Sequence, residues 1–98
     1  MGQDSERRVH DELYKAVLLL ASHTDSIQER LGAAYFSHLQ SLDVAALPVE
    51  AQVQFDWIRE QLKQLYPAPG KAHAVQIPTA VLLAQNIILL HYSLKWRQ

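Results

Sequence analysis

The residues of this chain best suited to chemistry are three of its five histidines, His10, His38 and His91. Neutral imidazoles bind Zn2+ and other divalent ions. In antiparallel helices with a rise of about 1.5 Å per residue, the three rings would lie at one depth, about 18–20 Å from a common end. One hypothesis is therefore a metal- or ligand-binding bundle with a histidine layer. The alternative is that each ring is an ordinary, hydrogen-bonded part of the core edge.

A second group of possible metal ligands falls on two predicted loops. His23 and Asp25 follow the first predicted helix, and His73 lies in the longest irregular segment, 66–76. These loops would meet at the end of the bundle away from the termini. The sequence allows a weaker version of the metal hypothesis there, and solvated connections are the alternative.

Signatures of catalysis are missing from the sequence. It contains no G-x-S-x-G, no H-E-x-x-H and no glycine-rich phosphate loop, and no glutamate stands three residues before a histidine. The lack of cysteine excludes disulfides, thiolate metal sites and cysteine nucleophiles, and agrees with a cytoplasmic location. We therefore expect a protein that is not an enzyme and that needs no cofactor.

A basic group near the two ends of the chain is the candidate site for nucleic acid. Its members are Arg7, Arg8, Lys95 and Arg97. A bundle of four helices would bring both ends together, beside aromatic rings that could stack on bases. The net charge of -1 gives no overall attraction for a polyanion, so a nucleic-acid-associated regulator is an alternative and not the main hypothesis.

The stretch 78–96 is the most apolar part of the chain, and it carries His91 and Lys95. Pro78 suits the first turn of a helix, and no later proline or glycine interrupts it. Its apolar residues form two stripes, one of Ile77, Val81, Ala84, Ile88 and Tyr92 and the other of Leu83, Ile87, Leu90 and Leu94. A helix that is apolar on two sides is usually buried or shared with a partner. Because Gln85, Asn86 and His91 interrupt the apolar run of this stretch, we expect that it does not span a membrane.

Three further amphipathic helices are predicted before this stretch, over 5–22, 26–41 and 48–66. Ser26 and Glu29 form a capping-box pattern, which indicates where the second helix begins. Pro48 marks the first turn of the third helix, and Pro67 ends it. Four amphipathic helices with short links predict an all-α fold, an antiparallel up-down four-helix bundle forming a single domain over 1–98.

Six apolar residues exceed what the core of one small bundle needs. They are Leu18, Leu19, Trp57, Leu83, Leu90 and Leu94. Exposed together, they would form a larger patch than monomers normally carry. We therefore predict that they form an interface with a second copy or with another protein. The main functional hypothesis is a small helical protein–protein interaction module, a self-associating regulator or accessory subunit.

Overall fold

The computed structural model describes residues 2–22, 24–69 and 74–94. Within these residues the chain forms four α-helices, α1 (Gly2–Ser22), α2 (Ile27–Ala34), α3 (Val49–Leu65) and α4 (Ile77–Ser93). A π-helical turn, η1 (Tyr35–Leu39), continues α2, and a 3-10 turn, η2 (Val44–Ala46), precedes α3. No strand occurs in the described ranges, so the predicted all-α class is confirmed.

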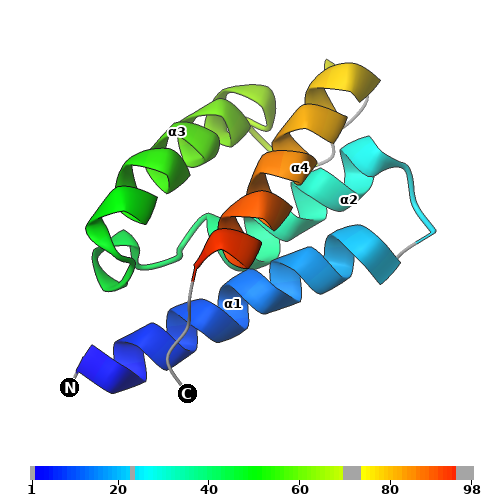
Figure 1. Ribbon diagram of the computed structural model, residues 1–98. Helices are drawn as coiled ribbons and strands as arrows, with labels where there is room; N and C mark the ends of the chain where they lie inside the picture. Colours follow the sequence, from blue (N-terminus) through cyan, green and yellow to red (C-terminus); the bar gives the residue numbers. More distant parts are fainter. Residues whose placement is uncertain (1, 23, 70–73, 95–98) are drawn as a thin grey trace.

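The helix α4 lies between α3 on one side and α1 and α2 on the other (Figure 1). It contacts all three of them. Successive helices run in alternating directions, which is consistent with the predicted up-down order (Figure 1). Residues that are far apart along the chain are therefore brought together around α4.

The core is made of the helix faces that the apolar periodicity indicated. From α1 it contains Val9, Leu13, Ala16 and Leu20, and from α3 it contains Ala51, Phe55, Ile58 and Leu62. From α4 it contains Ala80, Leu83, Ala84, Ile87 and Leu90. These residues recur at three and four positions, as a helix with one buried side requires. Only one side of α4 is therefore used by the core of this chain.

Side chains bond to several backbone groups at and just beyond the helix ends. The Ser26 hydroxyl accepts a hydrogen bond from the Glu29 amide at 3.2 Å, so the predicted cap of α2 is confirmed. The Arg30 guanidinium donates to the Leu20 carbonyl in the last turn of α1. Arg59 donates to the Leu42 carbonyl at 2.9 Å, just beyond η1. The last carbonyls of a helix have no partner within it, so the Arg30 contact ties α2 to the end of α1, and the Arg59 contact ties α3 to the link after η1.

The π-helical turn at Tyr35–Leu39 was not predicted. The Gln40 amide donates to the Tyr35 carbonyl at 2.7 Å, five residues back. Tyr35 and Leu39, at the two ends of this wider turn, are both buried.

The last helix is shorter than the predicted 78–96. It ends at Ser93, and Leu94 has extended backbone angles. The Leu90 carbonyl there accepts hydrogen bonds both from the Ser93 hydroxyl at 2.9 Å and from the Leu94 amide at 3.2 Å. No helix in the described ranges is long and apolar enough to cross a membrane.

Candidate functional site

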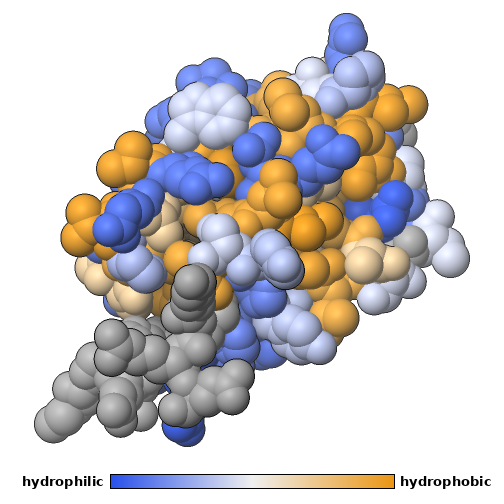
Figure 2. All heavy atoms as spheres, in the orientation of Figure 1, coloured by the Kyte–Doolittle hydropathy of each residue, from blue (hydrophilic) through white to orange (hydrophobic). Residues whose placement is uncertain are grey.

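The outer side of α4 carries six large apolar side chains that are exposed to solvent. They are Ile77, Val81, Leu82, Ile88, Leu89 and Tyr92, and we call them, with Gln85 at their centre, the α4 face. Their exposed fractions run from 38% at Val81 to 85% at Tyr92. Figure 2 shows apolar side chains gathered along the course of α4 on this side of the molecule.

No aspartate, glutamate, lysine or arginine occurs between Ile77 and Ser93. At about 100° per residue, all six apolar residues of the α4 face lie within about 80° of the direction of Gln85. Asn86, next to Gln85, is turned toward its own helix and donates to the Leu82 carbonyl at 2.8 Å. The α4 face is therefore apolar and uncharged, with one free-standing polar side chain in its middle.

The structure corrects the predicted interface residues on this helix. Leu83 and Leu90 are 2% and 1% exposed, so the expectation that they are surplus surface is wrong. Both pack into the core of the chain. The other stripe of α4, with Ile77, Val81, Ile88 and Tyr92, points outward. Leu19 and Leu94 are partly buried against the core, whereas Leu18 and Trp57 are 43% and 49% exposed.

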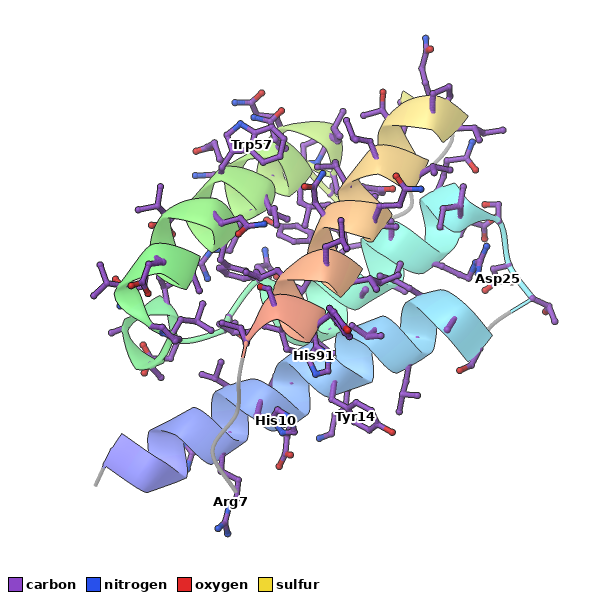
Figure 3. All side chains as sticks on the ribbon, in the orientation of Figure 1. Arg7, His10, Tyr14, Asp25, Trp57 and His91 are labelled. Atoms are coloured by element: carbon purple, nitrogen blue, oxygen red, sulfur yellow. The ribbon has the colours of Figure 1, made fainter. Side chains whose placement is uncertain are left out.

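A second, smaller apolar strip runs along α3. Val49 and Val53 are each 73% exposed, and Trp57 continues the strip one turn later. These residues lie opposite the buried side of α3, and Trp57 points away from α4 (Figure 3). The strip on α3 is therefore separate from the α4 face.

Two of the three predicted metal-binding histidines meet where α1 packs on α4 (Figure 3). The rings of His10 and His91 are stacked with centroids 5.6 Å apart, and Tyr14 lies 6.1 Å from His91. The Nε2 atom of His91 is buried without a hydrogen-bond partner. Burial, and to a lesser degree repulsion by His10, lowers the pKa of His91 below its usual 6.5. This cluster therefore favours neutral His91.

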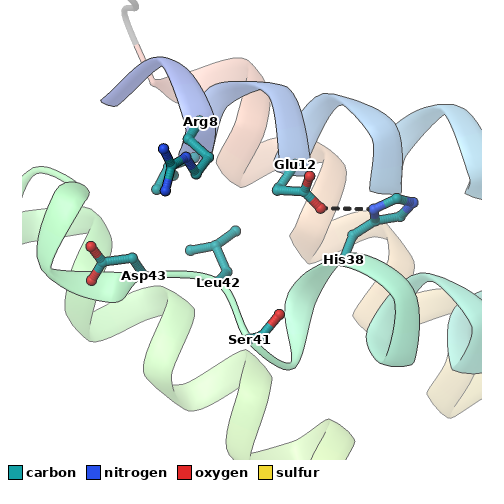
Figure 4. Close-up of a pocket in the computed structure, with 7 residues that line it drawn as sticks. Arg8, Glu12, His38, Ser41, Leu42 and Asp43 are labelled. Atoms are coloured by element: carbon teal, nitrogen blue, oxygen red, sulfur yellow. Dashed lines mark hydrogen bonds and ion pairs between the residues drawn. The ribbon is translucent and has the colours of Figure 1, made fainter. Parts of the chain in front are cut away.

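The third histidine lies elsewhere, so the predicted histidine layer does not form. His38 Nδ1 lies 2.9 Å from Glu12 Oε1 (Figure 4). Glu12 projects from a different side of α1 than His10, because two positions along a helix differ in direction by about 200°. The hydrogen bond to His38 is the main cause that lowers the pKa of Glu12 below its usual 4.5. The sequence could not reveal this pair, since it depends on the register between α1 and η1.

The Glu12–His38 pair borders a hollow of about 370 Å3 beside the link between η1 and α3 (Figure 4). Arg8 and Asp43 line its other side. The Asp43 carboxylate accepts a hydrogen bond from the Ala45 amide at 3.2 Å and so begins η2. Both carboxylates at this hollow are thus engaged within the chain.

The remaining predicted sites depend partly on residues outside the described ranges. His23 and His73 lie outside them, so the second metal hypothesis, which also involves Asp25, is not placed. Among the described residues, no group of three or more His, Cys, Asp or Glu side chains could hold a metal ion.

The basic group is also placed only in part. Arg7 and Arg8 are exposed on α1, whereas Lys95 and Arg97 lie outside the described ranges. The nucleic-acid hypothesis stays a prediction from the sequence.

Acid is expected to destabilise the fold in two steps. The pKa of His91 is lowered in the folded state, so the unfolded chain binds more protons and the free energy of unfolding falls as the pH drops below about 6.5. Glu12 adds a second loss as the pH falls below about 4.5, because its folded-state pKa is also lowered. Urea titrations over a pH series would measure both steps. We expect His91→Gln to abolish the first step and Glu12→Gln the second, and a wild-type stability that stays constant between neutrality and pH 5 would contradict this.

Three places thus stand out, the α4 face, the His10–His91 contact and the hollow at Glu12–His38, and the α4 face is the largest. Comparisons with protein-family models, with curated proteins and with solved structures give no match.

Proposed function

We propose that this protein is a small helical interaction module that self-associates through the α4 face and acts as a regulator or accessory subunit. The observation that carries the proposal is the presence of six large exposed apolar side chains on one uncharged helix. The lack of cysteine agrees with a reducing compartment, and we place the protein in the cytoplasm.

The size of the α4 face supports this proposal. If an aromatic side chain offers about 150–250 Å2 and an aliphatic one somewhat less, the exposed fractions correspond to roughly 600 Å2 of apolar surface. The largest apolar patch on a typical monomer covers about 300–600 Å2. A stable interface buries about 800 Å2 on each partner. The α4 face therefore lies at the upper end of the range for monomers and supplies roughly three quarters of the area that a stable interface buries on each partner, and its rim would supply the rest.

The energetics point the same way. At about 25 cal/mol per Å2, covering roughly 600 Å2 contributes on the order of 15 kcal/mol for each partner. Association costs about 4–15 kcal/mol in lost freedom of motion, and more for ordering side chains. The gain and the cost are of the same order, and buried area does not convert directly into affinity between proteins, so the α4 face offers a driving force for association without setting its strength.

The experiment that tests the proposal compares two single substitutions at exposed positions. Leu89→Glu places a charge in the α4 face, and Val53→Glu places the same charge on the α3 strip. A carboxylate buried without a partner in an apolar contact costs at least several kcal/mol, so we expect Leu89→Glu to weaken association by at least about 100-fold. Sedimentation equilibrium would measure the dissociation constant of each variant.

The Val53→Glu variant is the matched control, because it is expected to associate as the wild type does. Circular dichroism should show native helix content in both variants, since substitutions at exposed positions usually change folding stability by less than about 0.5 kcal/mol. If the two variants associate equally well, the α4 face is not the interface and the proposal fails in this form.

A further inference from the structure

We infer that the partner on the α4 face is a second copy of this chain, whose own α4 lies antiparallel to the first, with Gln85 of both copies beside the two-fold axis. This inference rests on the proposed function and adds the relative orientation and the register of the two copies. It follows from the order of residues on the α4 face, which reads nearly the same in both directions from Gln85.

The symmetry of the α4 face is visible in the positions of its apolar residues. Val81 and Leu82 stand four and three residues before Gln85, and Ile88 and Leu89 stand three and four residues after it. Ile77 and Tyr92 follow farther out, eight residues before and seven after. Gln85 is also the middle residue of α4 itself, which spans Ile77–Ser93.

An antiparallel copy turns this symmetry into matched contacts. A two-fold axis perpendicular to both helices reverses the direction along the helix but keeps the lateral side. Val81 then faces Ile88 of the partner subunit, and Leu82 faces Leu89 of the partner subunit. Ile77 in the same way faces Tyr92 of the partner subunit. Every large apolar side chain of the α4 face thereby meets another, as an interface between identical surfaces requires.

The polar residue in the middle fits the same arrangement. Gln85 is exposed, and its neighbour Asn86 is already bonded within α4. At the axis, the amide of each Gln85 can donate to and accept from the amide of the other copy. An amide in an otherwise apolar helix interface fixes the register, because any slip would bury it without a partner.

The charge distribution favours a second copy over a different protein. A partner bearing charged groups would find no opposite charge on α4 between Ile77 and Ser93. A second copy brings an equally uncharged surface, so no charge is desolvated at the centre of the contact. Like charges on the remaining helices stay at the rim, where water screens them.

Cysteine cross-linking can test the register cleanly, because the chain has no cysteine of its own. A disulfide forms only when the two Cα atoms approach within about 7 Å. In the antiparallel pair, two copies of Ile77 lie about 24 Å apart, whereas Ile77 and the partner's Tyr92 face each other. Under mild oxidation we expect Gln85→Cys to give a covalent dimer. We expect Ile77→Cys and Tyr92→Cys to cross-link when mixed and not when oxidised separately.

A second pair of cysteine variants provides an independent test, in case one substitution disturbs the contact. Leu82→Cys and Leu89→Cys should also link when mixed. Val53→Cys on α3 should stay monomeric on non-reducing gels. Self-linkage of Ile77→Cys in place of the mixed link would indicate parallel helices and would overturn the inference. A wild-type dimer by mass with no links from α4 would overturn the inference and leave self-association intact. A wild-type monomer by mass would overturn both.

Discussion

Leu83→Ala is expected to lower the free energy of unfolding by about 2–5 kcal/mol, whereas Leu82→Ala changes it by less than about 0.5 kcal/mol. The two leucines are adjacent, but Leu83 is 2% exposed and Leu82 is 54% exposed. Truncation at Leu83 leaves a cavity among the helices that α4 contacts. Truncation at Leu82 removes surface that faces solvent in the single chain. Urea denaturation of both variants, at protein concentrations low enough to favour monomers, measures the difference.

The same pair of variants separates folding from association. Leu82→Ala removes part of the α4 face, so it is expected to weaken the dimer while leaving the monomer stable. Leu83→Ala is expected to weaken the monomer and to leave the apolar surface of α4 in place. If Leu82→Ala proved as destabilising to the monomer as Leu83→Ala, the orientation of α4 described above would be wrong.

Tyr66→Ala is expected to destabilise the fold by about 3–5 kcal/mol, the usual cost of removing a buried aromatic ring. Tyr66 follows α3 and is 2% exposed. Its hydroxyl donates to the Gln28 carbonyl at 2.6 Å, and its ring packs edge-on to Phe36. The residue therefore joins the end of α3 to α2, and burial raises its pKa to about 12. Thermal or urea denaturation measures the loss, and Tyr66→Phe should lose only about 1 kcal/mol with the hydrogen bond.

The substitution Gly32→Ala tests the packing of the Tyr66 ring against α2. A Cβ atom on Gly32 would lie 2.7 Å from Cε1 of Tyr66, which is too close for unstrained packing. Overpacking of this kind costs about 1–3 kcal/mol, against a gain of up to about 1 kcal/mol from the better helix former. We expect Gly32→Ala to destabilise the wild type and to stabilise the Tyr66→Ala variant. The same sign in both backgrounds would show that the ring does not restrict Gly32.

Much of this architecture could be predicted from local patterns. The apolar periodicity located four helices, and the Ser26 cap located one helix end, because both signals lie within a single helix. The apolar character of α4 on two sides was also evident. The sequence does not show which of these two sides turns inward, since periodicity alone cannot tell a core stripe from an exposed one. For this reason the sequence places Leu83 and Leu90 at the interface, although residues of the other stripe, such as Ile88 and Tyr92, reach solvent.

The remaining differences come from contacts between helices. The predicted histidine layer follows from equal depth along the bundle, which leaves out the direction of each side chain. In the structure His38 points toward Glu12, and His10 and His91 contact each other. The π-helical turn changes the register of Tyr35–Leu39, and no single residue there signals it. The reason for Gly32 likewise lies in Tyr66, which is distant along the chain.

In the proposed dimer, a second copy of the chain covers the α4 face. The most direct measurement is the mass of the wild-type protein in solution, by light scattering or sedimentation over a range of micromolar concentrations. Self-association predicts twice the 11.2 kDa of one chain at the higher concentrations, with dissociation on dilution and loss of the dimer in Leu89→Glu. A mass of 11.2 kDa at every concentration would contradict it.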